Sequence, residues 1–206
     1  MQDQAKLSVS NKETIDLSGA EVYLTRNWLD QASSLVLYDT LVKDLAWTQP
    51  EVVVYGKRHR VPRLQCWQGI GTHTMVYSQT RFTTEPLHPA LSEILPRLQQ
   101  DCEIPLNSVL INYYRDGNDG MGWHADDERE LGESPLIASL SLGADRNFDF
   151  RRKNDHRVKH RLSLRSGDLL VMAGDTQRYW QHALPKTKRV QEGRINLTFR
   201  EIKMEV

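Results

Sequence analysis

His124 and Asp126 stand two residues apart in the stretch Trp123-His124-Ala125-Asp126, and both side chains are ligands for a hard metal ion. On an extended strand, residues i and i+2 point to the same face, so this pair could bind one ion without an unusual backbone. A pattern this short also occurs by chance. A functional interpretation therefore needs a third ligand, a site for a co-substrate and a place for a substrate.

The third ligand is best sought near the end of the chain. His182 lies in the short, largely apolar segment Trp180–Pro185, whereas His59, His156 and His160 lie in basic stretches that look exposed. Two histidines and one carboxylate, with three positions left open, form the ligand set of non-haem Fe(II) oxygenases. A zinc hydrolase could use the same three ligands, and a single histidine is more often part of a core.

The predicted last strand supplies the co-substrate site. One face carries Ile195, Leu197 and Phe199, which is ordinary packing. The other face carries two arginines and no acid, whereas a solvent-exposed face would usually carry mixed charges or lysine; its residues are Arg194, Asn196, Thr198 and Arg200. Guanidinium pairs bidentately with carboxylate, so this face predicts a cradle for a small organic acid. A zinc hydrolase would need no such cradle.

Asn112 and Tyr114 share one face of another predicted strand, residues 108–114, just upstream of His124. They could donate further hydrogen bonds to the same small anion. Without the other motifs, this would be an edge strand with a tyrosine whose hydroxyl reaches water.

The composition is that of an ordinary soluble globular protein. The chain has 206 residues, of which 39% are hydrophobic and 26% charged, which fits one domain. No apolar run approaches the roughly 20 residues that span a bilayer, and the polar start is not a signal peptide. Cys66 and Cys102 are unclustered, which indicates free thiols in a reducing compartment, by default the cytoplasm.

The formal net charge is +0, but the signs are segregated along the chain. Basic residues cluster at 57–63, 151–153, 157–161 and 186–189, and acidic residues are densest at 126–130. Segregated signs allow a basic face toward a phosphate backbone. Any single cluster is also expected of solvated loops and charge-protected strand edges.

The pattern of elements predicts an α+β, mainly β, fold. Residues 28–46 show helical spacing after a cap at Thr25 or Asn27, and a short helix follows Pro89, with a kink or an early end at Pro96. Residues 1–20 indicate a poorly ordered arm or an edge strand. Strands are expected at 22–25, 51–54, 72–78, 108–114, 135–142, 147–152, 158–164, 169–173, 182–185 and 194–200. Many short strands with turns between them predict a sandwich, jelly roll or barrel, here covered by an N-terminal helical layer.

Five motifs together resemble the AlkB family of Fe(II)- and 2-oxoglutarate-dependent nucleic-acid demethylases, in particular its duplex-DNA-acting animal-type homologues. The match runs in the family's order from about residue 50 to residue 200, and its motifs are Asn112–Tyr114, Trp123–Glu128, Ile137–Gly143, Trp180–Pro185 and Arg194–Arg200. The resemblance implies a double-stranded β-helix (jelly roll) core at 108–206, with N-terminal helices packed on it. An extension at 21–107 would carry a nucleotide-recognition lid and a hairpin, behind an arm at 1–20.

The resemblance also implies the cofactors and the reaction. Fe(II) would be held by His124, Asp126 and His182, with 2-oxoglutarate and dioxygen in the open positions. Arg194 and Arg200 would engage the two carboxylates of 2-oxoglutarate, and Asn112, Tyr114, Asn196 and Thr198 would complete that site. An N-methyl group on 1-methyladenine or 3-methylcytosine in DNA would be hydroxylated and leave as formaldehyde, while 2-oxoglutarate is decarboxylated to succinate.

The substrate site follows from the same resemblance. A base inside a duplex must be extruded to reach such a metal. Tyr55 would fill the gap, and Lys57, Arg58, Arg60 and Arg63 would hold phosphates. The lid is expected to include Trp67, Met75, Tyr77 and Ser78; Met75 stands where relatives often have an aromatic residue. A carboxylate of Asp127 or Glu128 could bind a cationic methylated base, although a solvated acidic turn would look the same.

Other functions stay open at this stage. The chain could be an AlkB-like demethylase of RNA or protein, or a small-molecule 2-oxoglutarate oxygenase, which would not need the basic stretch at 57–63. A catalytically silent nucleic-acid binder is disfavoured because every predicted ligand is present. We expect alkylated DNA as the partner, with RNA as the second option, no membrane and a monomer. A eukaryotic source would add the nucleus to the compartments.

Overall fold

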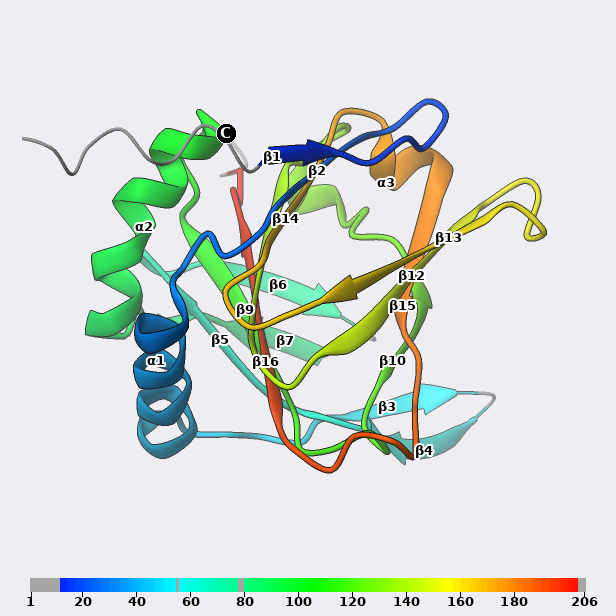
Figure 1. Cartoon of the computed structure of the whole chain (residues 1–206). Coiled ribbons are helices and arrows are strands. Elements are labelled where there is room, and N and C mark those ends of the chain that lie inside the picture. Colours follow the sequence, from blue (N-terminus) through cyan, green and yellow to red (C-terminus); the bar gives the residue numbers. More distant parts are fainter. Residues whose placement is uncertain (1–11, 55, 78–79, 204–206) are drawn as a thin grey trace, which may run out of the picture.

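The computed structural model describes residues 12–54, 56–77 and 80–203, and its strands form two main sheets (Figure 1). The major sheet has the order β1 (Lys12–Thr14), β2 (Glu21–Thr25), β14 (Leu169–Ala173), β11 (Ile137–Gly143), β16 (Arg194–Arg200), β9 (Ser108–Tyr114), β5 (Leu64–Gly69) and β8 (Glu85–Pro86). The minor sheet has the order β10 (Met121–His124), β15 (Trp180–Leu184), β12 (Arg146–Arg152) and β13 (Lys159–Leu164). From β9 to β16 the chain crosses repeatedly between the two sheets, which makes the predicted jelly roll.

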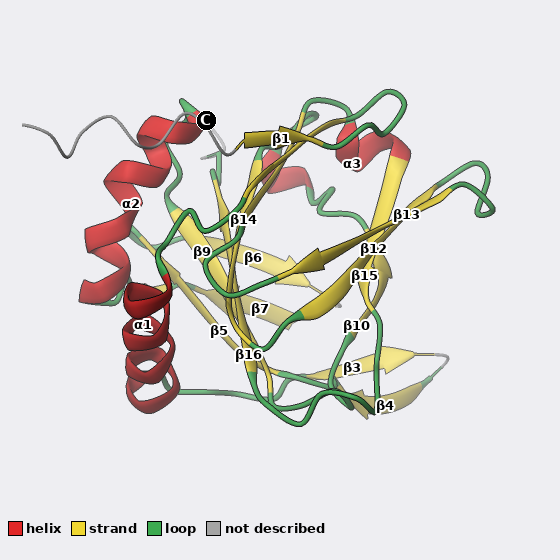
Figure 2. Cartoon of the chain, viewed as in Figure 1, coloured by secondary structure: helices red, strands yellow, loops and turns green. Residues whose placement is uncertain are grey.

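Two helices cover one face of the major sheet, as predicted. Figure 2 shows α1 (Gln31–Asp44) and α2 (Pro89–Cys102) together on one side of the strands. Leu41 and Leu95 from these helices share a hydrophobic cluster with Ile195 and Leu197 of β16. The opposite face of the sheet contributes to a second cluster, which includes Phe150 of the minor sheet. Alternation along β16 therefore separates ordinary packing on one face from polar residues on the other.

The helix boundaries correct two predictions. The first helix starts at Gln31 and not at residue 28, because Asp30 is the N-cap and its carboxylate accepts from the Ser33 N–H at 3.0 Å. The second helix continues through Pro96 to Cys102, so an early end at that proline is wrong. Burial of the flanking Leu95 and Leu98 offsets the hydrogen bond that a proline cannot donate. A kink there stays a prediction.

Strands from both parts of the chain build the major sheet. Residues 12–14 form the edge strand β1, and Ile15 and Leu17 behind it are buried, so this part of the expected arm is packed; residues 1–11 lie outside the described residues. The sheet also includes β2, β5 and β8, and it therefore crosses the division expected at residue 108. The sequence did not predict β5, because polar residues alternate along its cavity-facing side and hide its pattern.

Two hairpins stand apart from the main sheets. The first pairs β3 (Glu51–Val54) with β4 (Lys57–Arg60), and the second pairs β6 (Thr74–Tyr77) with β7 (Thr80–Thr83). The remaining short elements are the 3-10 helix Arg129–Leu131 and α3 (Thr176–Tyr179), which leads into β15. Among the described residues, no helix has the length and apolar character that crossing a membrane requires.

Candidate active site

A cavity of about 210 Å³ lies against the polar face of β16 and contains most of the predicted site. Neighbouring strands bring the polar residues together in rows, because Asn196 of β16 pairs with Asn112 of β9, which pairs with Gln65 of β5. The next row consists of Thr198, Leu110 and Trp67. The lining also includes His124, Asp126, Glu128, Ser139, His182, Arg63, Tyr114, Arg194 and Arg200.

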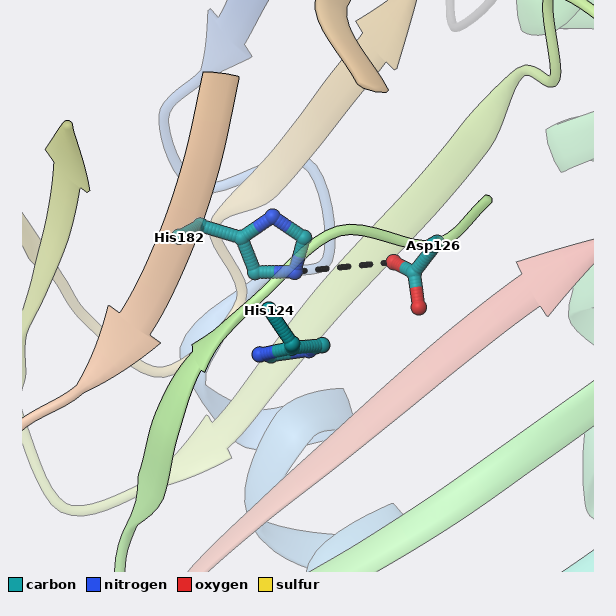
Figure 3. A group of neighbouring side chains, drawn as sticks. All are labelled: His124, Asp126 and His182. Carbon is teal, nitrogen blue, oxygen red and sulfur yellow. Dashed lines mark ion pairs between the residues drawn. The ribbon is translucent and has the colours of Figure 1, made fainter. Parts of the chain in front are cut away.

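The three predicted metal ligands converge in this cavity (Figure 3). His124, Asp126 and His182 each offer one ligand atom, and these atoms all lie within 4.8 Å of one another. The imidazole rings of the two histidines stand edge to face with their centroids 4.2 Å apart, and His182 Nε2 lies 3.5 Å from Asp126 Oδ2. Two imidazoles and a carboxylate at this spacing form the predicted facial set of ligands.

Hydrogen bonding and ring stacking orient the two histidines. His124 ends β10 directly opposite His182 of β15. Its Nδ1–H donates a hydrogen bond to the Gly122 carbonyl at 2.9 Å, which leaves the lone pair of Nε2 available to bind a metal ion. The His182 ring stacks on Phe148, with centroids 5.3 Å apart and an interplanar angle of 19°. Burial lowers the pKa of His182 to about 3, and the nearby His124 adds to this effect. Neutral imidazole is the form that binds a metal.

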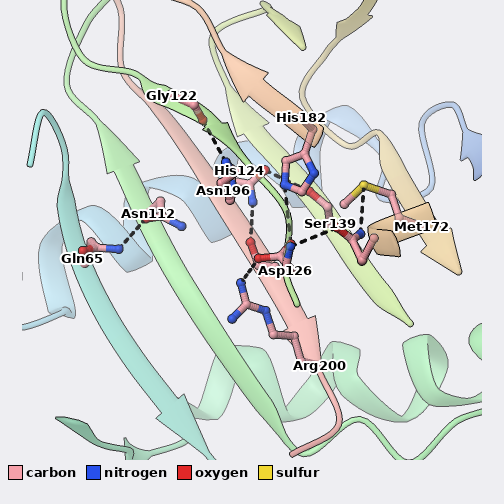
Figure 4. Close-up of polar contacts among 12 residues, drawn as sticks. Gln65, Asn112, Gly122, His124, Asp126, Ser139, Met172, His182, Asn196 and Arg200 are labelled. Carbon is pink, nitrogen blue, oxygen red and sulfur yellow. Dashed lines mark hydrogen bonds and ion pairs between the residues drawn. The ribbon is translucent and has the colours of Figure 1, made fainter. Parts of the chain in front are cut away.

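Asp126 departs from the simple strand picture. Because β10 ends at His124, Asp126 lies in the following loop, and the expected i, i+2 placement on one strand is not what brings the pair together. Instead Arg200 Nη2 donates to Asp126 Oδ1 at 2.6 Å (Figure 4), and the Asp126 N–H donates to Gln177 Oε1 at 3.0 Å. Burial would raise the pKa of Asp126, but Arg200 and the two imidazoles outweigh it, so the pKa lies below its ordinary value. Asp126 is therefore an ionised ligand.

Arg194 is a buried cation without a counter-charge. Its side chain donates from Nη2 to Ser141 Oγ at 2.8 Å and to Asn196 Oδ1 at 2.9 Å, and no carboxylate in the described part of the chain forms an ion pair with it. Its Nε is buried without a hydrogen-bond partner. Burial lowers the pKa of Arg194 to about 10, which shows how poorly the charge is compensated. An organic dianion in the cavity would supply the missing charge and acceptors.

These residues fit the predicted metal and co-substrate. The donor set suits Fe(II), and the orphaned Nε atoms of Arg194 and Arg200 suit a carboxylate-bearing molecule. A family model described as the 2OG-Fe(II) oxygenase superfamily matches residues 21–200.

The chain belongs to the 2OG-Fe(II) oxygenase superfamily. Fe(II), 2-oxoglutarate and dioxygen are therefore its cofactors and co-substrates. This confirms the predicted metal and removes the zinc hydrolase from consideration.

Similar proteins narrow the branch of this superfamily. The chain is 36% identical over 194 residues to human alpha-ketoglutarate-dependent dioxygenase alkB homolog 3, and it covers 66% of that protein with 89% of its own length. It is 43% identical over 160 residues to the mouse DNA oxidative demethylase ALKBH2, with 74% of this chain and 66% of the relative covered. The Arabidopsis thaliana DNA oxidative demethylase ALKBH2 is 35% identical over 219 residues, with 92% and 69% covered. These matches confirm the resemblance to the AlkB family.

The fold also agrees with a solved relative. The structure of OsALKBH1 superposes with a TM-score of 0.68 at 18% sequence identity, and the match covers 92% of this chain and 99% of that one. At this identity the likeness speaks for the 2OG-Fe(II) oxygenase fold alone. The chain spans 66% of the length of the human alkB homolog 3 that it matches.

Arg63 lies in the wall of the oxygenase cavity, and not at the surface where the sequence analysis expected it. The sequence placed it among exposed phosphate-binding residues, but it is only 6% exposed. Its Nε donates to Asn112 Oδ1 at 2.8 Å, and Gln65 Nε2 donates to the same oxygen at 2.9 Å. Two donors on one amide oxygen orient Asn112. Arg63 therefore acts inside the cavity and not on the surface.

The two acidic residues after the metal motif have different surroundings. Asp127 is exposed and pairs with Lys153 Nζ at 2.9 Å. Glu128 lines the cavity, and its Oε2 is buried without a hydrogen-bond partner. Burial raises the pKa of Glu128, and the neighbouring Asp126 carboxylate raises it further. Of the two, Glu128 is the carboxyl group placed to meet a molecule in the cavity.

The outer substrate residues are only partly described. Trp67 lines the cavity, whereas Arg58 is exposed, with its side chain at 81%, and it lies 4.0 Å from Glu51. Tyr55 and Ser78 lie outside the described residues. Lys57, Met75 and Tyr77 belong to strands β4 and β6, in which only their backbone is described. The proposed roles of these residues stay predictions.

Two residues that contact predicted site residues escaped the sequence analysis. Gln65 and Trp67 share the cavity face of β5, with Arg63 just before the strand, and an i, i+2 pattern could have revealed Gln65 if β5 had been predicted. Gln177 lies in the four-residue helix α3, which carries no periodic signal. Nothing in the sequence links it to Asp126, 51 positions away.

Proposed function

We propose that this oxygenase is a DNA oxidative demethylase that removes N-methyl groups from 1-methyladenine and 3-methylcytosine. The methyl group is hydroxylated and its carbon leaves as formaldehyde; the ring nitrogen keeps the electron pair of the broken C–N bond and a proton is released. One oxygen atom of dioxygen enters the formaldehyde and the other enters the succinate that forms, with carbon dioxide, from 2-oxoglutarate. One observation carries the proposal: a single cavity joins the metal ligands, an arginine without a carboxylate partner and the Glu128 carboxyl, whose Oε2 is buried without a hydrogen-bond partner. The name DNA oxidative demethylase of the ALKBH2 relatives supports the substrate class.

At the metal end, His124, Asp126 and His182 would hold Fe(II) on one side and leave the cavity side open. When bound, Fe(II) with 2-oxoglutarate and dioxygen supplies the oxidation of the methyl C–H bond. The protein's part is to keep the His182 imidazole neutral and the Asp126 carboxylate ionised. Burial of His182 and the ion pair between Arg200 and Asp126 do this.

At the co-substrate end, Arg194 would pair with the carboxylate of 2-oxoglutarate that lies farther from the metal. Asn196 orients Arg194 by accepting from it at 2.9 Å, and its own Nδ2 donates to Thr198 Oγ1 at 2.8 Å. Tyr114 lies under Arg194, with the guanidinium carbon 5.7 Å from the ring centroid. Arg200 would meet the other carboxylate through Nε, since its Nη2 is engaged by Asp126.

At the substrate end, Glu128 would accept hydrogen bonds from the methylated base. 1-Methyladenine and 3-methylcytosine carry a positive charge, and a half-buried carboxylate with one unpartnered oxygen favours such a cation over a neutral base. Trp67 offers an aromatic surface in the same cavity. Burial raises the pKa of Glu128, and a cationic base beside it would favour the ionised form.

The nucleic acid itself would bind outside the cavity. The side chains of Arg58 and Arg60 on β4 are 81% and 72% exposed, and their nearest carboxylate is Glu51, at 4.0 and 3.6 Å. Ion pairs this exposed contribute little and exchange readily for phosphates. We propose that this hairpin holds the backbone while Tyr55 occupies the gap left by an extruded base.

The direct test uses oligonucleotides with one 1-methyladenine or 3-methylcytosine, as single and double strands of DNA and of RNA. With Fe(II) and 2-oxoglutarate, we expect formaldehyde and the restored base in equal amounts from DNA. His124→Ala should lose turnover and keep DNA binding. No product from any methylated strand would overturn the proposal, and product from RNA alone would assign the enzyme to RNA.

Tyr55→Ala tests the role of the hairpin. We expect a larger loss with duplex substrates than with single strands, because only the duplex leaves a gap to fill. Equal losses on both would remove this role. Activity on free methylated nucleosides at the same efficiency would instead favour a small-molecule oxygenase.

The setting of the enzyme is part of the proposal. Cys66 and Cys102 are both free thiols, which fits a reducing compartment such as the cytoplasm or nucleus. We propose a monomer, which sedimentation of the purified protein would test.

A further inference from the structure

Asp126 is a metal ligand that lies beyond the strand that should support it. The ladder between β10 and β15 ends where His124 pairs with His182. Continued by two residues, the same register would place Asp126 opposite Trp180, but β10 stops at His124. The backbone N–H of Asp126 therefore has no strand partner, although the residue is only 3% exposed. A buried N–H of this kind needs another acceptor.

Gln177 supplies that acceptor. Its Oε1 accepts from the Asp126 N–H at 3.0 Å, and its side chain is 1% exposed. The other end of the amide faces Met172 of β14, with Nε2 3.7 Å from Sδ. Gln177 belongs to α3, the short connection between β14 and β15, so both ends of its amide are fixed by packed elements.

The contact matters because the carboxylate of Asp126 is fixed at one oxygen only. Arg200 holds Oδ1 at 2.6 Å, and Oδ2 is left 3.5 Å from His182 Nε2. How closely Oδ2 approaches the two imidazoles depends on where the backbone of Asp126 lies. Among the described residues, the hydrogen bond that the Asp126 N–H donates to Gln177 Oε1 is what fixes that backbone position.

We propose that Gln177 is a positioning residue of the metal centre: its amide oxygen replaces the missing strand partner of Asp126 and keeps the Asp126 carboxylate directed at the two histidines. Gln177 is not among the residues that line the cavity, so it touches neither co-substrate nor substrate there. The inference rests on the metal site of the proposed function, and it predicts an effect on metal retention before any effect on chemistry.

The test measures Mn(II) binding to the metal-free protein by calorimetry. Gln177→Leu keeps most of the side-chain volume and removes the acceptor, and we expect the Kd for Mn(II) to rise roughly 10- to 100-fold, the usual effect of losing a group that orients a ligand. The Fe(II) concentration for half-maximal turnover should rise by the same factor. Turnover at saturating Fe(II) should fall much less, which separates retention of the metal from catalysis.

Three further variants make the result specific. Gln177→Glu keeps an acceptor oxygen at the same reach and should bind Mn(II) nearly as well as the wild type. Gln177→Asn keeps the amide but is one methylene shorter, so it should resemble Gln177→Leu. Arg178→Ala removes an exposed neighbour on the same helix and should change nothing.

The outcomes separate this inference from the metal site itself. If the wild type binds no Mn(II) or Fe(II), the metal site fails and the role of Gln177 fails with it. If the wild type binds and a folded Gln177→Leu binds equally well, only the positioning role is overturned. If Gln177→Leu does not fold, the comparison of Gln177→Asn with Gln177→Glu decides. Equal Mn(II) affinities of these two variants would overturn the positioning role of Gln177.

Discussion

Replacing Arg194 with methionine should separate co-substrate binding from the stability of the protein alone. Arg194 is 1% exposed, and its hydrogen bonds go to the neutral acceptors Ser141 Oγ and Asn196 Oδ1. Throughout the described ranges, it has no carboxylate partner. The folded protein therefore carries a buried cation that the co-substrate would neutralise. Removing it should change stability little without 2-oxoglutarate and should remove most of the stabilisation that 2-oxoglutarate gives.

The size of each effect follows from these contacts. Burial lowers the pKa of Arg194 to about 10, which corresponds to a penalty of roughly 3 kcal/mol on the charged form. Methionine removes this penalty but also two hydrogen bonds to a charged group, which contribute about 1.5–3 kcal/mol each. The net change in unfolding free energy should stay within about 3 kcal/mol. Loss of the pair with a carboxylate should weaken 2-oxoglutarate binding by about 2–4 kcal/mol, or roughly 30- to 1,000-fold.

Thermal unfolding measures both effects in one experiment, with Mn(II) replacing Fe(II) so that no turnover occurs. At a 2-oxoglutarate concentration of about 100 times its Kd, the wild type should gain about 2.7 kcal/mol. At about 2–4 °C per kcal/mol, Tm should rise by roughly 5–10 °C. Arg194→Met should gain about 1 kcal/mol or less under the same conditions. If 2-oxoglutarate raised the Tm of Arg194→Met as much as that of the wild type, Arg194 would not be the residue that binds the co-substrate carboxylate.

Arg146 provides a matched control. It is 2% exposed, but its Nη atoms donate to the carbonyls of Asp116, Asp119 and Pro185, and it does not line the cavity. Arg146→Met removes three hydrogen bonds from a charged donor, so it should lower the unfolding free energy by at least about 3 kcal/mol. The rise in Tm that 2-oxoglutarate causes in Arg146→Met should match the rise in the wild type. Arg146→Lys is the milder substitute if the methionine variant does not fold.

Three further predictions test other contacts. Glu128→Gln should lower kcat/KM roughly 10- to 100-fold on the cationic 1-methyladenine and much less on the neutral 3-methylthymine. The substitution removes a carboxylate charge that contributes about 1.4–2.8 kcal/mol to binding a cation. Equal losses on both bases would contradict the role of Glu128 in recognising the cation. Burial, together with Glu85, raises the pKa of the Cys66 thiol to about 12, so the protonated thiol stabilises the fold fully below its ordinary pKa near 9, and this contribution is lost as the pH rises toward 12. In denaturant unfolding between about pH 8.5 and 11, the unfolding free energy of Cys66→Val should therefore fall less steeply with pH than that of the wild type. Asp101→Ala should lower the unfolding free energy by about 1–2 kcal/mol, because Trp28 Nε1 donates to Asp101 Oδ2 at 2.7 Å. A stability equal to wild type would show that this hydrogen bond between α2 and the segment before α1 contributes nothing.

The sequence could predict those parts of the fold that alternation and turns encode. The strands at 108–114, 169–173 and 194–200 agree with the structure to the residue, because each has clear apolar alternation or clear flanking turns. The two faces of β16 were also predictable, since its apolar face packs on the helices and its polar face lines the cavity. Both properties are local, so a single sequence contains them.

The rest depended on which segments meet in space. β5 was missed because its cavity face carries Gln65 and Trp67 between glycine and proline loops, which hides the strand pattern. Arg63 was assigned to the surface because its neighbours in sequence are basic, whereas its side chain, just before β5, donates to Asn112 on the paired strand β9. The ion pair between Arg200 and Asp126 joins residues 74 positions apart, and no local pattern reports such a distance.

Asp126 shows why the metal site and the fold cannot be treated separately. Its carboxylate is held by Arg200 from β16, its backbone by Gln177 from α3, and its metal-binding partner His182 comes from β15. None of these contacts exists until the two sheets of the jelly roll have closed on each other. In the unfolded chain the three ligands are not assembled, so free energy released on binding Fe(II) stabilises the closed sheets. Because Asp126 lies in a loop and is held by Arg200 of β16, metal binding depends on how the β10–β15 pair of the minor sheet meets β16 of the major sheet.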